Sequence, residues 1–136
     1  MRGVPEKSAR KLKQVLKFIK YWLPVIIYAI IIFNVSSVPG EEIPFLFSFQ
    51  DVVFHILEYA LLATLVSRAL RAYYPAMIFS RRFLWVLILT VVYAFSDEFH
   101  QAFVPNRDPS FLDVFYDSLG VLLAGIIYRQ ENRLRR

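Results

Sequence analysis

The sequence predicts an all-α membrane protein, a bundle of four transmembrane helices with both termini in the cytoplasm. Three observations predict this fold. The chain of 136 residues is 57% hydrophobic with a mean hydropathy of +0.47, which is too apolar for an ordinary soluble domain of this size. It contains four apolar stretches that can each cross a bilayer as a helix. If all four cross, nearly every basic residue falls on one side, which is the positive-inside pattern.

The basic residues form three blocks: the N-terminal tail, the segment between the second and third apolar stretches, and the C-terminal tail. Their members are Arg2, Lys7, Arg10, Lys11, Lys13, Lys17, Lys20; Arg68, Arg71, Arg81, Arg82; and Arg129, Arg133, Arg135, Arg136. Arg107 is the one exception. Because the net charge of +5 lies at the ends of apolar segments, we expect membrane lipid as the partner and no nucleic acid. The chain has no cysteine, which excludes disulfides and thiolate metal sites.

The predicted spans cover residues 17–35, 51–70, 82–103 and 111–128, so that residues 17–128 form one transmembrane domain between basic tails at 1–16 and 129–136. The third span has a short apolar part. Its purely apolar part, residues 83–95, is shorter than the roughly 20 residues that a crossing requires. Residues 96–103 must therefore complete it, which places Asp97, Glu98 and His100 in the outer leaflet region of the bilayer.

Polar residues recur at helical spacing near the outer end of each later span. The second span carries Asp51, His55, Glu58 and Tyr59, the third carries Asp97, His100 and Gln101, and the fourth carries Asp113, Asp117 and Gly120. Since ionisable groups within apolar spans are costly, they are a functional-site hypothesis. We expect the stripes to converge in one outward-facing cavity, with Arg107 above it as an anion clamp or counter-ion.

Structural roles compete with this hypothesis. Asp51 and Asp113 each stand three residues after a serine, as an acid does in the first turn of a capped helix. A metal is the other alternative, with His55, His100 and Asp97 as candidate ligands. Their spacing matches no known metal signature, so we expect neither a metal nor another cofactor.

Four ordered segments resemble one known family. They are S-S-V-P-G at residues 36–40, D-V-V-F-H at 51–55 followed by Tyr59, S-D-E-F-H-Q-A-F-V-P-N-R at 96–107, and the series Ser110, Asp113, Asp117, Gly120. Together they are similar to the signature of the VanZ-like family of small bacterial membrane proteins, over about residues 34–125. Two positions depart from it: Asn106 stands where Gly is common, and Asp117 stands where Asn is common.

The resemblance implies a multi-pass protein of the bacterial inner membrane, in a family whose name-giving member is linked to low-level teicoplanin resistance. Three functions fit the residues. The first is binding of an anionic lipid-linked or lipidated envelope ligand, such as a lipoglycopeptide or wall precursor. The residues expected to contact it are Arg107, Asp97, Glu98, His100, Gln101, Asp113, Asp117 and Tyr59, with His55 and Asp51 completing the polar floor.

The second is a membrane-embedded hydrolase or phosphoryl transferase, in which His100 is the general base, oriented by Asp97 or Asp51, with His55 beside it. The third is a ligand-free scaffold whose polar residues hold the helices together.

Overall fold

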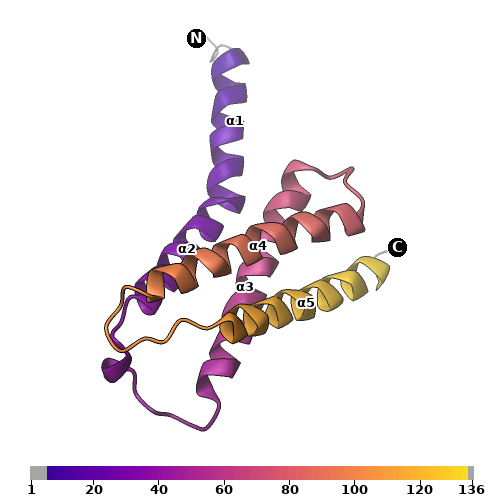
Figure 1. Ribbon diagram of the computed structural model, residues 1–136. Coiled ribbons are helices and arrows are strands. Elements are labelled where there is room, and N and C mark those ends of the chain that lie inside the picture. Colours follow the sequence, from indigo (N-terminus) through magenta and orange to yellow (C-terminus); the bar gives the residue numbers. More distant parts are fainter. Residues whose placement is uncertain (1–5, 135–136) are drawn as a thin grey trace.

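The computed structural model describes residues 6–134, with side chains up to residue 130 (Figure 1). Arg2, Arg135 and Arg136 of the predicted basic tails lie outside the described residues, as does the side chain of Arg133. The elements in chain order are α1 (Glu6–Tyr21), α2 (Leu23–Ser36), a short 3-10 helix η1 (Gly40–Glu42), α3 (Gln50–Tyr73), α4 (Phe79–Gln101) and α5 (Phe111–Leu134). This part of the chain contains no β-strand.

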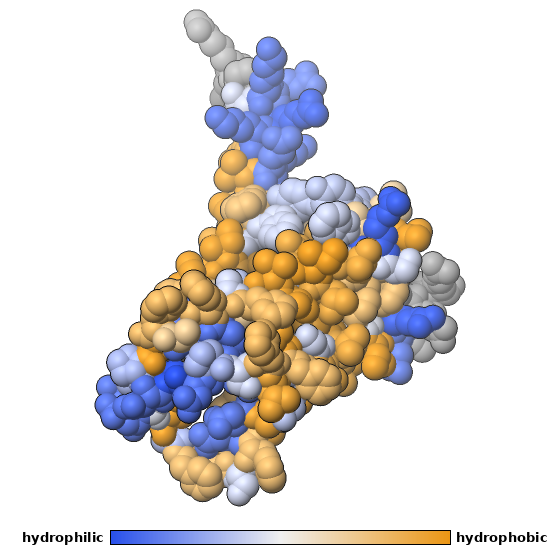
Figure 2. All heavy atoms as spheres, viewed as in Figure 1, coloured by the Kyte–Doolittle hydropathy of each residue, from blue (hydrophilic) through white to orange (hydrophobic). Residues whose placement is uncertain are grey.

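Four helical segments are long and apolar enough to cross a membrane. They are the nearly continuous α1–α2 pair (Glu6–Ser36), α3, α4, and Phe111–Gln130 of α5. The predicted all-α, four-span membrane fold is therefore confirmed. Figure 2 shows an apolar band between hydrophilic ends, one over the loops that follow α2 and α4 and another over α1. Side chains within the band, such as Ile30, Val92 and Ile126, are more than half exposed, as lipid-facing residues must be.

The first segment differs from its predicted span. Residues 6–16, predicted as a tail, continue the helix as α1, which extends beyond the other helices (Figure 1). The long helix bends at Trp22, because Pro24 has no N–H to donate to the Lys20 carbonyl. That carbonyl accepts a hydrogen bond from Arg68 Nη2 of α3 instead, at 3.1 Å. This hydrogen bond joins the bend between α1 and α2 to the C-terminal part of α3.

The boundaries of the third span shift by two or three residues. α4 begins at Phe79 and ends at Gln101, where residues 82–103 were expected. Residues 96–101 do extend the apolar helix, so Asp97, Glu98 and His100 lie in its last turns.

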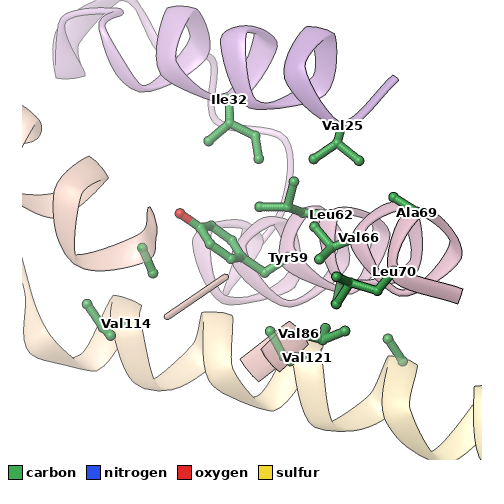
Figure 3. Close-up of a cluster of buried hydrophobic side chains, with 13 residues drawn as sticks. Val25, Ile32, Tyr59, Leu62, Val66, Ala69, Leu70, Val86, Val114 and Val121 are labelled. Carbon is green, nitrogen blue, oxygen red and sulfur yellow. The ribbon is translucent and has the colours of Figure 1, made fainter. Parts of the chain in front are cut away.

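α3 is the central helix and packs against α2, α4 and α5. Its side chains Tyr59, Leu62 and Val66 meet Ile32 from α2 and Val121 from α5 in the buried core (Figure 3). The closest approach is at Gly120, where a Cβ atom would collide with the carbonyl oxygen of Ile56. Glycine at this position therefore lets α5 lie directly against α3. This packing brings the acidic first turns of α5 beside the polar stripe of α3.

The two ends of the bundle differ in charge. Lys17 lies over the Tyr73 ring at 4.6 Å, and Arg68 contacts the α1–α2 bend, so these basic residues gather where α3 ends. The carboxylates gather at the other end, where α3 and α5 begin. Which end faces the cytoplasm stays a prediction from the positive-inside rule.

Candidate functional site

The two loops at the acidic end are fastened together. Gly40 N donates to the Pro105 carbonyl at 3.1 Å, and Asn106 Nδ2 donates to Glu41 Oε2 at 2.9 Å. A Cβ atom on Gly40 would collide with the Asn106 carbonyl oxygen. Asn106 itself has a φ of 56°, a left-handed conformation that Gly and Asn adopt most readily. This explains why Asn can stand where the family commonly has Gly.

His55 is the centre of the charged cluster at this end. Its Nδ1 lies 2.9 Å from Asp117 Oδ1, the one ion pair found among the described residues. Asp117 is almost fully buried, which favours its pairing with a hydrogen-bond donor. With Nδ1–H donating to the carboxylate, Nε2 is left as the ring nitrogen that can accept a proton or bind a ligand.

Two further carboxylates lie beside His55. His55, Glu98 and Asp113 can each place one ligand atom within 4.8 Å of the others. Glu98 is buried: its Oε2 accepts a hydrogen bond from Ser110 N at 2.8 Å, and its Oε1 is buried without a partner. We call His55, Glu98, Asp113 and Asp117 the His55 cluster. Three helices, α3, α4 and α5, contribute to it.

Two pockets adjoin the His55 cluster. The polar pocket, of about 370 Å³, lies between the loops and the start of α3, and its charged or amide lining includes Asp51, His55, Gln101, Arg107, Asp108 and Asp113. The apolar pocket, of about 330 Å³, lies between α4 and α5, and its lining includes Phe95, Phe99, Phe111 and Val114. Glu98 lines the apolar pocket and also belongs to the His55 cluster. Its carboxyl group therefore stands between a polar and an apolar cavity.

Arg107 lines the polar pocket and, among the described residues, bonds to backbone carbonyls and to no carboxylate. Its Nε donates to the Val38 carbonyl at 3.0 Å and its Nη2 to the Val35 carbonyl at 3.3 Å. The guanidinium thus caps the C-terminal end of α2, where carbonyl groups and the helix dipole favour a cation. Two of its five N–H donors are used there, and the edge formed by Nη1 and Nη2 retains two donors side by side.

His100 is held in a different way. Its Nε2 lies 2.9 Å from Ser37 Oγ, and its ring stacks on Phe33 with centroids 4.1 Å apart. These hydrogen-bond and stacking partners belong to α2 and the residue after it. The orientation of His100 by Asp97 or Asp51, expected for an enzyme, is not what the structure shows. The histidine that a carboxylate orients is His55.

Asp97 and Tyr59 lie deeper in the bundle. Asp97 is buried, with Oδ2 3.5 Å from Gln101 Nε2 and Oδ1 without a partner. Tyr59 is 1% exposed, and its hydroxyl group has no hydrogen-bond partner. Neither residue lines the polar or the apolar pocket, whereas the other predicted ligand-binding residues, apart from His100 and Asp117, line one of them. Asp117 supports the site through His55.

Sequence reasoning missed three features of this site. It named His55 and Asp117 separately but not as a pair, it missed the stacking of Phe33 on His100, and it missed the apolar pocket. No local pattern signals the pair, because the two residues lie 62 positions apart on different helices. The phenylalanines of the loops and Phe111 are the signal in the sequence that could have indicated an apolar surface at this end.

Four membrane-crossing helices with a polar pocket at one end define a multi-pass membrane protein with a candidate ligand site. The chain belongs to the VanZ/LLP1 family, whose family model matches residues 5–134. The resemblance noted from the four sequence segments is thereby confirmed. Comparisons with curated proteins and with solved structures found no match.

Proposed function

We propose that this VanZ-like protein binds a lipid-linked or lipidated amphiphile of the cell envelope, with its head group in the polar pocket and its chain in the apolar pocket. One observation carries the proposal: Glu98 lines the apolar pocket while its carboxyl group lies beside His55 and Asp113 of the polar pocket. Adjacent polar and apolar cavities fit a molecule with a polar and an apolar part. Their volumes lie in the usual range for small-molecule sites.

The polar pocket supplies the contacts for the head group. Arg107 keeps a two-donor edge that suits a phosphate or carboxylate, and Gln101 and Asn106 add amide groups. Against this, Asp51, Asp108 and Asp113 repel an anion. An anionic group is therefore best accommodated in direct contact with Arg107, whose guanidinium offsets this repulsion.

The apolar pocket supplies the place for the chain. It is bordered by Phe99 and Phe111, which are 71% and 85% exposed and so face the lipid. A hydrocarbon chain can enter sideways from the bilayer. Because the bilayer is as apolar as the pocket, the pocket selects and orients the chain more than it increases affinity.

The cellular role follows from this location. We place the protein in the inner membrane with the polar pocket facing outward, where lipid-linked wall precursors and lipoglycopeptides are exposed. Binding of such a ligand in the two pockets would contribute to resistance to teicoplanin-type glycopeptides. Family membership and the positive-inside pattern support this role.

Photocrosslinking tests the proposal. A benzophenone amino acid replaces either Phe95, which lines the apolar pocket and is 49% exposed, or Phe115, which is 54% exposed and lies outside the pocket. After irradiation in cells, the Phe95 variant should crosslink one class of amphiphile selectively, whereas the Phe115 variant should crosslink bulk phospholipid. The same bulk lipid profile at both positions would contradict the proposal.

A second candidate function is hydrolysis or phosphoryl transfer on an envelope lipid. The observation that favours it is the His55–Asp117 pair, since a carboxylate on Nδ1 leaves Nε2 as a general base. His55 replaces His100 in this role. A His55→Gln variant would then keep the bound amphiphile but lose turnover. Loss of turnover in His100→Gln alone would contradict this assignment.

A further inference from the structure

We infer that His55, Glu98 and Asp113 form a binding site for one divalent metal ion of the Zn²⁺ or Mn²⁺ type. The three side chains come from α3, α4 and α5, and each can place a ligand atom within 4.8 Å of the others. Ligand atoms about 2.1 Å from a tetrahedral zinc ion lie roughly 3.4 Å from each other. The three ligand atoms, within 4.8 Å of one another, exceed this spacing by at most about 1.4 Å, a gap that side-chain rotation can close.

The donor set suits such an ion. One imidazole nitrogen with two carboxylate oxygens is a combination that zinc and manganese accept, and the absence of thiolates disfavours softer metals. Three protein ligands leave at least one coordination position open. Since His55 and Asp113 line the polar pocket, that position faces the pocket.

Asp117 adds the support that metal-bound histidines usually have. It accepts the hydrogen bond of His55 Nδ1 at 2.9 Å, which fixes the ring and leaves Nε2 free for the ion. A carboxylate on the far nitrogen also makes the imidazole a better donor to a metal. Asp117 and His55 thus have the geometry of the carboxylate–histidine part of a carboxylate–histidine–metal arrangement.

Glu98 gives an independent indication. It is 7% exposed, yet its Oε1 has no hydrogen-bond partner among the described residues. A buried, unpaired carboxylate oxygen is unfavourable, and a bound cation is a partner that removes the cost. Ser110 N holds the other oxygen at 2.8 Å, so the carboxyl group is already oriented.

A divalent ion would also reduce the negative charge of the polar pocket. It would offset the charge of the carboxylates around His55, and its open position would face the pocket that Arg107 also lines. An anionic head group could then contact both cations. This last role rests on the proposed function, whereas metal binding does not.

The site differs from the one that the sequence suggested. His100 is bonded to Ser37 and stacked on Phe33, and Asp97 lies outside the three-residue group. These contacts make His100→Gln a matched control for His55→Gln. Asp108, which lines the polar pocket without belonging to the group, supplies the control for the carboxylates.

Calorimetric titration tests the inference with the metal alone. The full-length protein in detergent is stripped with a chelator and titrated with ZnCl₂ and, separately, with MnCl₂. One saturable site is expected for at least one ion. The affinity for the ion should fall more than about 100-fold in each of the variants His55→Gln, Glu98→Gln and Asp113→Asn. In Asp117→Asn it should fall by about 10–100-fold. The affinity for the ion should change less than about threefold in Asp108→Asn and His100→Gln, because these changes remove no metal ligand.

X-ray absorption on the metal-loaded wild-type protein removes any dependence on how the variants fold. An imidazole shell with oxygen neighbours at about 2.0–2.2 Å is expected. No saturable binding by wild type, equal losses in the controls, or a bound ion without imidazole would each overturn the inference. Because no lipid is present, such a failure leaves the amphiphile proposal to be judged by photocrosslinking.

Discussion

The two histidines of this protein stand at the same end of the bundle in contrasting surroundings. His55 is paired with Asp117, lies beside Glu98 and Asp113, and lines the polar pocket. His100 is bonded to Ser37 and stacked on Phe33, which ties α4 to α2. The side chains that the neighbouring helix supplies therefore decide whether a histidine belongs to a binding site or to the helix packing.

The origin of the contrast is the packing of α5. Gly120 permits α5 to lie against α3, and this places Asp113 and Asp117 beside His55. α2 presents Phe33 and Ser37 to His100 and no carboxylate.

The largest effect is expected at Gly120. A Gly120→Ala change sets a Cβ atom against the Ile56 carbonyl, so α5 must move away from α3. We expect a loss of about 2–3 kcal/mol, the upper part of the range for overpacking, together with loss of ligand at the His55 cluster. Thermal melting in detergent measures it, with Leu119→Ala at a more exposed site as control. A melting temperature equal to wild type would mean that the α3–α5 contact is looser than described.

Replacing each histidine by glutamine separates a role in function from a role in packing. His55→Gln removes the ion-pair partner of Asp117 and should abolish any teicoplanin protection. His100→Gln should retain protection and lose about 1 kcal/mol of stability, since the stacking on Phe33 is lost while an amide can still reach Ser37. Susceptibility and melting of both variants are the measurements. Equal loss of protection would show that both histidines belong to one site.

Arg107 has two roles that can be separated. It donates to the carbonyls of Val35 and Val38, so Arg107→Ala should cost about 1.5–3 kcal/mol, as hydrogen bonds from charged groups do. Arg107→Lys should recover part of this stability but not the function, because an ammonium group lacks the planar two-donor edge. Melting and teicoplanin susceptibility are compared in the same variants. Full activity of Arg107→Ala would exclude Arg107 from ligand binding.

At Asn106 the expected effect is confined to the stability of the loop, with no loss of ligand. Its φ of 56° is strained for a side chain with a Cβ branch, so Asn106→Val should destabilise the loop by about 1–2 kcal/mol. Asn106→Gly should be nearly neutral, losing only an exposed hydrogen bond to Glu41. Melting of the two variants side by side checks this. A larger loss for glycine than for valine would show that the hydrogen bond matters more than the backbone.

Hydropathy and charge were sufficient to predict the four spans, because both reflect the bilayer and need no knowledge of tertiary packing. The polar stripes likewise predicted which helix ends carry the candidate residues, and the structure brings these ends together. Their partners could not be predicted, because helical spacing gives the face of a residue and not the helix that covers it. His100 illustrates this, since its partner Ser37 lies 63 positions away. The helical α1 was missed because its lysines resemble a solvated tail.

The central claim is that the His55 cluster holds the ligand and that His100 supports the fold. Native mass spectrometry of the full-length protein, purified in mild detergent from bacterial membranes, tests it most directly. Wild type and His100→Gln should carry the same bound amphiphile, and Glu98→Gln, which alters the group shared by both pockets, should lose it. Retention in Glu98→Gln together with loss in His100→Gln would contradict the claim.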